Sequence, residues 1–419
     1  MMPEHDLPNG HIDRCQICGS DDLRLHLDLG FHPPCDSLLW PRQLDQPERS
    51  YPLRFLTCGN CSLAQIDYVV PTEELFFPDY PYRSGITQTL VEKLSQTAVS
   101  TREKFKLDER DLVIDIGSND GTVLAGFKRF GLRVLGVEAT NIARIANENG
   151  IETIQAFFDA SIAERILKDY GAASVITATN VFAHVASLGS IIRGVSQVLR
   201  DGGVFVTESH YIVPLLETVQ YDSIYHEHLR YYSMKSIIHL FSYYGFTVVD
   251  VERIGNYGGS IRVFAVKGSG QAVGQRVEEL LALEEKLGIY SMEPYDRFAA
   301  ATRKARRDLL ALVLEIVERG ERVVGIGCPG RASTLLNYTG LDPGLMPYIA
   351  EQATSLKLGL YAPGRHIPVV DERRMLEEQP EYAVMLSWHY AEPIIRNLRK
   401  AGLHSKIILP LPEVRISEI

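Results

Sequence analysis

Residues 113–122, VIDIGSNDGT, decide the fold of this chain. The apolar residues that open the stretch are typical of a buried β-strand, and the glycine-rich residues that follow are typical of a tight turn into a helix. Glycines at such a turn allow the backbone to approach a bound ligand closely, as in nucleotide-binding βα turns. The stretch therefore predicts the first strand and first turn of an α/β domain, with a ligand at the turn.

The acids around this turn favour S-adenosylmethionine over a dinucleotide. Asp115 and Asp120 lie where the pyrophosphate of NAD would be repelled, whereas sulfonium and ammonium groups tolerate carboxylates. Glu138 ends the next strand, about 20 residues on, where an acid can accept both ribose hydroxyls. An NAD or NADP site and a plain turn without ligand are the alternatives. The residues expected to hold the cofactor are Asp115, Gly117, Asn119, Asp120, Gly121, Glu138, Asn180 and Asp159, where an acid that contacts adenine would fall.

Strand-like and helical patterns alternate on both sides of this turn. The runs RVLGVEA, ETIQA, SVITATN and VFVTES are separated by helical segments, which predicts a parallel sheet. The runs TVVDVERI and SIRVFAVKG lie close together and predict an antiparallel pair at the sheet edge. Charged helices are expected over 275–319, and a second small α/β domain is expected from residue 322. We expect three domains, over residues 1–72, 73–270 and 271–419.

The cysteines near the N-terminus are spaced as metal ligands. Cys15 and Cys18 form one CxxC pair, and Cys58 and Cys61 form a second. Four thiolates in a tetrahedron are the standard closed site for structural Zn²⁺. Gly19 and Gly59 follow a cysteine of each pair, where a positive φ is often needed. Four unrelated buried or redox thiols are the alternative. The other two cysteines, Cys35 and Cys328, are expected to be ordinary buried thiols.

Titratable side chains are dense in residues 222–232, DSIYHEHLRYY, between the strand VFVTES and a helix capped by Ser233. Ligands of open α/β folds bind at this edge of the sheet. His184 follows another strand at the same edge, and 80–85, YPYRSG, precedes the first strand. Each of these features has a plain alternative, namely a solvated loop, a capping histidine and tyrosines that only pack.

A further loop, 325–331 with the sequence GIGCPGR, opens a helix of the last α/β region. It could face a phosphate, with Arg331 and Lys357 as charge partners. A packing turn is the alternative for this loop.

Composition limits the partners. The 419 residues are 45% hydrophobic and carry a formal net charge of -10, which argues against nucleic acid or an anionic membrane as the main partner. The sequence contains neither a signal-peptide core nor an apolar run of membrane-spanning length. We expect a cytoplasmic protein, as a monomer or small homo-oligomer.

Taken together, these motifs resemble the S-adenosylmethionine-dependent C-methyltransferases of nucleotide-linked 4-keto-6-deoxysugars. The resemblance covers nearly the whole chain and includes the paired CxxC module and the segments YPYRSG, IGSNDG, NVFAHV, YHEH and NYGGSIRVF. It implies an α/β protein with a class I methyltransferase Rossmann-like domain, an N-terminal zinc-binding module and a C-terminal second Rossmann-like domain that helps to hold the nucleotide sugar. The catalytic residues that it implies are Tyr80, His184, Tyr225, Glu227 and His228. The substrate-binding residues that it implies are Tyr82, Arg83, Ser84, Asn256, Arg331 and Lys357, and Tyr82 can replace Tyr80 as the functional tyrosine.

The implied chemistry suits these residue types. A hydrogen on the carbon next to a ketone is acidic enough for a positioned imidazole, so His228 is expected to be the base and Glu227 to orient it. Tyr225 or His184 would then donate a hydrogen bond to the enolate oxygen. The methyl branch is expected at C-3 rather than C-5. The alternatives are an NAD-dependent nucleotide-sugar oxidoreductase, a sugar O-methyltransferase, and a zinc-ribbon adaptor with a degenerate methyltransferase core.

Overall fold

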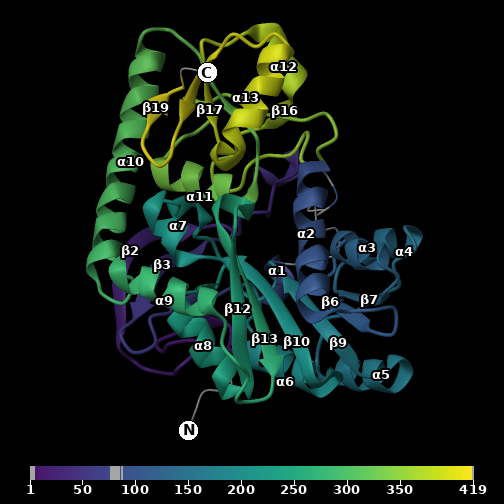
Figure 1. Cartoon of the computed structure of the whole chain (residues 1–419). Helices are drawn as coiled ribbons and strands as arrows, with labels where there is room; N and C mark the ends of the chain where they lie inside the picture. The colour runs from purple at the N-terminus through teal and green to yellow at the C-terminus, as the bar shows by residue number, and fades with distance from the viewer. Residues whose placement is uncertain (1–4, 76–84, 86–87, 418–419) are drawn as a thin grey trace.

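The computed structural model describes residues 5–75, 85 and 88–417. Its largest sheet has seven strands, lies at the centre of the region expected to be the methyltransferase domain, and is called the methyltransferase sheet (Figure 1). In order across the sheet, the strands are β12 (Phe246–Ile254), β13 (Ser260–Lys267), β10 (Leu199–His210), β9 (Ala173–Thr179), β6 (Leu112–Ile116), β7 (Arg133–Glu138) and β8 (Thr153–Gln155). The strands from β10 to β8 are parallel, and β12 and β13 form an antiparallel pair at one edge. Both features confirm the expected arrangement.

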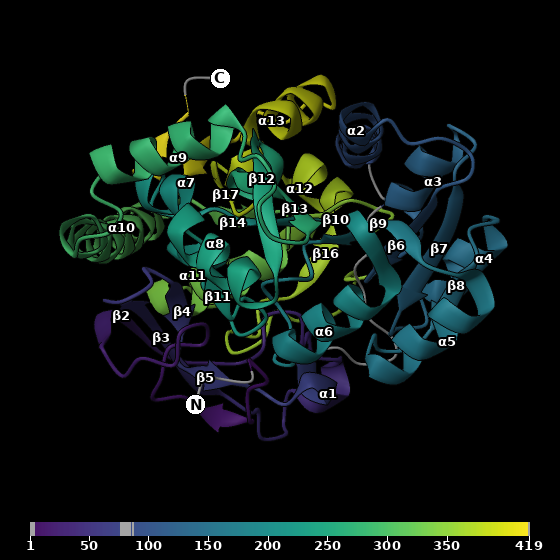
Figure 2. The ribbon, with the colours of Figure 1, turned by 60° about the horizontal axis from the view of Figure 1, so that its bottom comes forward.

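Helices cover both faces of this sheet, because consecutive residues of a strand point to opposite faces. Val113 of β6 belongs to a cluster with Leu94 and Phe127, whereas Ile114 belongs to a cluster with Ile166 and Ile192. Figure 2 shows α2 and α3 on one side of the strands and α5 and α6 on the other. The helices of this region are α2 (Gln88–Phe105), α3 (Thr122–Lys128), α4 (Ala143–Glu148), α5 (Ala160–Tyr170), α6 (Leu188–Val198), α7 (Ile212–Glu217) and α8 (Met234–Tyr243), with the 3-10 turns η3 (Tyr221–Ser223) and η4 (Asn256–Gly258).

The N-terminal module contains an antiparallel four-stranded sheet in the order β11-β4-β3-β2. Its strands are β2 (Leu23–His32), β3 (Tyr51–Cys58), β4 (Ala64–Ile66) and β11 (Arg230–Tyr231). The first three come from the module itself, but β11 comes from the segment that sequence analysis marked as catalytic. The module therefore shares a sheet with that segment. The remaining N-terminal elements are β1 (Gly10–His11), β5 (Tyr68–Val69), η1 (Pro41–Gln43) and α1 (Thr72–Leu75).

A second parallel sheet forms the C-terminal domain, which lies above the methyltransferase sheet in Figure 1. Its strands, in order, are β16 (Val369–Asp371), β15 (Ile349–Glu351), β14 (Val323–Ile326), β17 (Tyr382–Met385), β18 (Lys406–Leu409) and the antiparallel β19 (Arg415–Ile416). Helices α9 (Gln275–Lys286) and α10 (Glu293–Glu318) connect the two regions as expected, and α10 runs along one side of the molecule. The domain's own helical elements are α11 (Gly330–Thr339), α12 (Glu372–Glu378), η5 (Trp388–Tyr390) and α13 (Ala391–Lys400).

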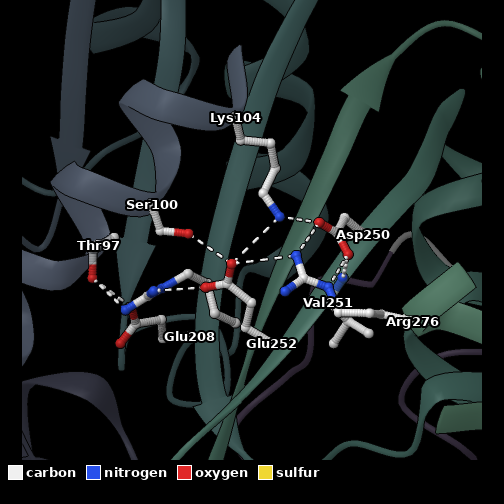
Figure 3. Close-up of polar contacts among 9 residues, drawn as sticks. Thr97, Ser100, Lys104, Glu208, Asp250, Val251, Glu252 and Arg276 are labelled. Atoms are coloured by element: carbon white, nitrogen blue, oxygen red, sulfur yellow. Dashed lines mark hydrogen bonds and ion pairs between the residues drawn. The ribbon is translucent and has the colours of Figure 1, made fainter. Parts of the chain in front are cut away.

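A network of charged side chains holds α2 against the edge of the methyltransferase sheet (Figure 3). At its centre the Arg262 guanidinium lies 2.6 Å from the Glu208 carboxylate, and both side chains are buried. Thr97 of α2 donates to the same carboxylate at 2.7 Å. The other members are Ser100, Lys104, Asp250, Glu252 and Arg276. The network fixes α2 against the sheet.

Among the residues that the structure describes, no helix combines the length and apolar character needed to cross a bilayer.

Candidate active site and metal centre

Four cysteine sulfurs meet in the N-terminal module. The Sγ atoms of Cys15, Cys18, Cys58 and Cys61 all lie within 4.8 Å of one another. Cys15 is 3.4 Å from Cys61, and Cys18 is 3.5 Å from Cys58. Thiolates bound to one zinc ion at about 2.3 Å in a tetrahedron are separated by similar distances. The donor set fits Zn²⁺, and because four sulfurs complete its coordination, the ion is structural.

The two glycines beside these cysteines have different roles. Gly19 has a φ of +70°, as expected, but Gly59 does not adopt the left-handed conformation, which corrects the expectation; in the second pair it is Ser62 that has a φ of +61°. An added Cβ on Gly59 would lie 2.0 Å from Oδ2 of Asp22, a half-exposed side chain that would have to turn away. The N–H of Gly59 donates to the Asp22 carbonyl oxygen at 2.9 Å, which ties the cysteine turn to the start of β2.

The glycine-rich bend after β6 forms the expected cradle. Gly117 and Gly121 have φ angles of +69° and +82°, which are costly for other residues. The N–H of Gly117 donates to the carbonyl oxygen of Val137 at 2.8 Å, and the N–H of Asn119 donates to the Glu138 carboxylate at 2.9 Å. Glu138 therefore lies directly beside the bend, where a ribose would be bound.

All four acids expected to contact the cofactor already have partners in the chain. Glu138 accepts from the N–H of Asn119 and from the N–H and hydroxyl of Thr140. Asp115 accepts a hydrogen bond from Thr177 Oγ1 at 2.6 Å, and burial raises its pKa to about 7. Asp120 accepts from the N–H of Gly85 at 2.7 Å, which joins the bend to the residues before α2. Asp159 caps the N-terminus of α5 and is exposed. Their contact with the methyl donor stays a prediction.

Asn180 presents the clearest polar group for a ligand at this edge. It follows β9 with a φ of +56°, and its N–H donates to the Glu208 carbonyl oxygen at 2.9 Å. Its Oδ1 is buried and has no hydrogen-bond partner in the described part of the chain. Buried polar atoms are usually paired, so this oxygen fits a donor group on a bound cofactor. Together with the glycine cradle and Glu138, it fits S-adenosylmethionine.

A cluster of aromatic and histidine side chains surrounds His228. The ring of Tyr225 lies 3.9 Å from that of His228, between centroids, and the rings of His184 and His210 lie at 4.6 Å and 4.4 Å. Nδ1 of His228 is 2.8 Å from the carbonyl oxygen of Ser223. Because a carbonyl only accepts, Nδ1 carries the proton in the neutral ring and Nε2 has the free lone pair.

Burial lowers the pKa of His228 well below its usual range, and the neighbouring His210 and His184 lower it further. The ring is therefore neutral at physiological pH, which is the form that can accept a proton.

This cluster lies next to the cofactor bend. A Cβ on Gly117 would lie 2.3 Å from Cγ2 of Val181, so these two residues are in close contact. The Val181 carbonyl oxygen accepts from the N–H of His184 at 2.8 Å, and His184 contacts His228. The structure thus brings His184, Tyr225 and His228 together beside the bend.

The Ser223 carbonyl binds Nδ1 of His228, and the orientation of this ring by Glu227 stays a prediction. The Glu227 carboxylate accepts from the thiol of Cys35 at 3.3 Å. Both Cys35 and Cys328 are buried, as expected.

The residues expected to bind substrate differ in their surroundings. Asn256 is buried at the start of η4, and its carbonyl oxygen accepts from the N–H of Gly259 at 2.8 Å. Arg331 lies 3.0 Å from Asp222, and Lys357 lies 2.7 Å from Asp36, so both cations are already paired with carboxylates. Four further candidates, Tyr80, Tyr82, Arg83 and Ser84, lie outside the described residues.

Sequence reasoning missed His210, which contacts His228, and the pair Trp388 and His389, of which Trp388 donates to Asp222 in the same segment. His210 is the last residue of β10, a position that the strand pattern could have indicated because the carboxyl ends of parallel strands face the ligand. Trp388 and His389 come from the C-terminal domain, and no local pattern connects them with the catalytic segment.

Three family models match consecutive parts of the chain. They are "Putative zinc binding domain" over residues 15–76, "Methyltransferase domain" over 86–251 and "C-methyltransferase C-terminal domain" over 255–412. The fold and the site therefore define a class I S-adenosylmethionine-dependent methyltransferase with an N-terminal zinc-binding domain. This is the expected fold class. It decides against the NAD-dependent oxidoreductase and the non-enzymatic adaptor.

Among relatives, the chain is 34% identical over 411 residues to "C-methyltransferase NovU" of Streptomyces niveus. The matched residues cover 97% of each chain. The protein belongs to this C-methyltransferase family. Solved structures that resemble it include magnesium protoporphyrin IX methyltransferase from Synechocystis with bound S-adenosylmethionine (10% identity, 42% of this chain, 79% of that chain, TM-score 0.33). The protein PH0226 from Pyrococcus horikoshii is similar as well (16% identity, 47% of this chain, 99% of that chain, TM-score 0.35).

The cofactor cradle can be tested with a pair of glycine variants. Gly117→Ala places a Cβ 2.3 Å from Val181, whereas Gly131→Ala, with a φ of +81°, meets nothing within 4 Å. In both variants the left-handed backbone conformation of the new alanine lowers the free energy of unfolding by about 1–2 kcal/mol. Only Gly117→Ala should also distort the cradle, and we expect it to weaken S-adenosylhomocysteine binding by about 10-fold or more, measured by calorimetry. Equal affinities of the two variants would refute the proposed cradle.

The buried histidines predict how stability depends on pH. Burial lowers the pKa of His184 to about 4 and that of His210 to about 3, whereas an unfolded histidine has a pKa of about 6.5. Below about pH 6.5 the unfolded chain binds more protons, so the free energy of unfolding falls as pH falls, by up to about 1.4 kcal/mol per pH unit for each such histidine.

His210→Asn removes one of these groups. Its stability difference from the wild type should therefore narrow as pH falls from about 6.5 to 5, measured by urea unfolding. Acid release of zinc affects both proteins and cancels in the difference. If the difference in free energy of unfolding between the two proteins does not depend on pH, the lowered pKa of His210 does not affect stability.

Proposed function

We propose that this enzyme adds a methyl branch to a ring carbon next to the ketone of a nucleotide-linked 4-keto-6-deoxyhexose, at C-3 rather than C-5. The observation that carries the proposal is the neutral imidazole of His228, which carries its lone pair on Nε2 and is in ring contact with Tyr225 and His184 at the cofactor edge of the sheet. The sequence resemblance to deoxysugar C-methyltransferases supports the substrate class.

In this proposal His228 Nε2 removes the proton from the carbon next to the ketone. The electron pair of the broken C–H bond moves into an enolate, whose oxygen needs a hydrogen-bond donor. The Tyr225 hydroxyl is the first candidate because burial raises its pKa well above the usual range and keeps it protonated. His184 is the second candidate donor. Tyr80 is proposed to be catalytic, and Tyr82, Arg83, Ser84 and Asn256 are proposed to hold the sugar.

S-adenosylmethionine supplies the electrophilic methyl group when it is bound. The role of the bend and of Glu138 is to place that group at contact distance from the sugar carbon, which removes much of the entropic barrier. Asn180 would orient the amino-acid part of the donor. The C-terminal domain is proposed to hold the nucleotide.

A carbon nucleophile explains why the site contains both a base and donors. An O-methyltransferase needs only to deprotonate a hydroxyl, whereas formation of an enolate also requires stabilisation of the developing charge on the neighbouring oxygen. The rings of Tyr225 and His184 each contact the ring of His228, so the three side chains can perform both tasks.

The test is to incubate the enzyme with methyl-labelled S-adenosylmethionine and a panel of dTDP-, GDP- and CDP-linked 4-keto-6-deoxyhexoses. The expected product carries the label on C-3. A separate incubation in D₂O without the donor should exchange the hydrogen on that carbon. Label on a hydroxyl oxygen, or no transfer to any keto sugar, would overturn the proposal.

A further inference from the structure

Helix α11 of the C-terminal domain holds the loop that leads to His228. The Arg331 guanidinium donates to Gln220 Oε1 at 3.0 Å and to the hydroxyl of Ser223. One helical turn further on, the Thr334 hydroxyl donates to the carbonyl oxygen of Ile224 at 2.8 Å. Two side chains of one helix thus hydrogen-bond to the loop at Gln220, Ser223 and Ile224.

The buried carboxylate of Asp222 also binds Arg331. Oδ2 of Asp222 lies 3.0 Å from Nε of Arg331, and Oδ1 accepts from Nη2 of the same guanidinium at 3.1 Å. The indole N–H of Trp388 also donates to Oδ2, at 2.7 Å. The side chains of Asp222 and Arg331 are 0% and 6% exposed. Removal of one partner of such a pair leaves an uncompensated buried charge, so the pair holds the loop firmly. Two elements of the C-terminal domain, α11 and η5, contribute to it.

The loop contacts the His228 ring through the carbonyl oxygen of Ser223. The carbonyl oxygen of Ser223, the residue next to Asp222, accepts from His228 Nδ1 at 2.8 Å and from the Tyr231 hydroxyl at 3.0 Å. The position of that oxygen decides which ring nitrogen carries the proton, because the hydrogen bond of one imidazole nitrogen sets the state of the other. If the oxygen moves away, Nε2 can carry the proton, and in that tautomer Nε2 can no longer accept a proton from substrate.

We propose that Asp222 and Arg331 are positioning residues, through which the C-terminal domain fixes the orientation and tautomer of His228. The role of His228 as the base rests on the proposed function, whereas its tautomer does not. The proposal differs from the sequence expectation that Arg331 binds substrate phosphate. A guanidinium that is already paired with a buried carboxylate has little charge to offer a second anion.

The decisive experiment observes the tautomer directly. Protein labelled with ¹⁵N-histidine is studied by NMR without substrate, and the His228 signals are assigned by their loss in His228→Asn. In the wild type we expect His228 to be protonated on Nδ1. In the double variant Asp222→Asn/Arg331→Gln, which removes both charges together, we expect a mixture of tautomers.

The matched control is Arg374→Gln/Glu378→Gln, which removes a more exposed ion pair of 2.7 Å from α12 of the same domain. It should leave the His228 signals unchanged. If the Asp222/Arg331 variant does not fold, Trp388→Phe removes one donor to Asp222 and decides in its place. An unchanged tautomer in whichever variant folds would overturn the proposal.

Kinetics separate positioning from substrate binding. With dTDP-4-keto-6-deoxyglucose as the probe, loss of positioning should lower kcat by about 10–100-fold, with KM changed by less than about 3-fold. A raised KM with unchanged kcat would instead assign Arg331 to the substrate. If no keto sugar is methylated, the proposed function fails, but the NMR result still decides the positioning role.

Discussion

Replacing His228 by asparagine is expected to lower kcat for methyl transfer by about 10²–10⁴-fold. The amide can still donate to the Ser223 carbonyl that now binds the ring at 2.8 Å, so the loop should keep its shape. The amide has no basic lone pair, so removal of the proton next to the ketone should stop. The measurement is methyl transfer from labelled donor, together with hydrogen–deuterium exchange at the sugar carbon in D₂O.

The matched control is His226→Asn, two residues earlier in the same loop. The ring of His226 is also buried, but its Nε2 lies 3.1 Å from the carbonyl oxygen of Pro52 and so faces the zinc module. We expect its folded fraction to retain a rate within about 3-fold of the wild type. S-adenosylhomocysteine affinity should be unchanged in both variants. Undiminished C–H exchange in His228→Asn would exclude this ring as the base.

The parts of this molecule that could be predicted depend on local patterns. The strand through Val113 and Ile114 carries apolar residues on both faces, which indicates a strand covered on both sides, and the glycines that follow allow only a few conformations. The two CxxC pairs indicated a shared metal before any fold was known, because their spacing is a property of zinc coordination. Such signals remain valid wherever the rest of the chain lies.

The parts that could not be predicted depend on contacts between distant segments. The partner of His228 is a backbone carbonyl, and a backbone carbonyl has no signature in the sequence. Arg331 was interpreted as a phosphate ligand because its partner Asp222 lies more than one hundred residues away. The sequence predicts a positive φ at Gly59, whereas the structure has it at Ser62. For His228 and Arg331 the residue type indicates a functional role, but the sequence does not indicate which group binds the side chain.

Removal of zinc is expected to unfold the N-terminal module and to inactivate the enzyme, although the ion is not catalytic. Structural zinc sites contribute on the order of 10–16 kcal/mol of apparent binding free energy, more than the total stability of most domains. Two N-terminal segments contact the catalytic loop directly. The N–H of Ile66 donates to the Leu229 carbonyl oxygen at 3.1 Å, and the carbonyl oxygen of Ser62, next to Cys61, accepts from Ser233 at 3.0 Å.

Because β11 pairs with β4 of the zinc module, loss of the ion should loosen the loop that carries His228. Cys58→Ser should therefore accelerate amide hydrogen exchange first in Tyr51–Cys58 and Ala64–Ile66, and then in residues 224–232, measured by mass spectrometry. The control is Cys328→Ser, which alters a buried thiol of the C-terminal domain and should leave both regions protected. If the module loses protection while 224–232 stay protected and active, the shared sheet does not couple the zinc site to catalysis.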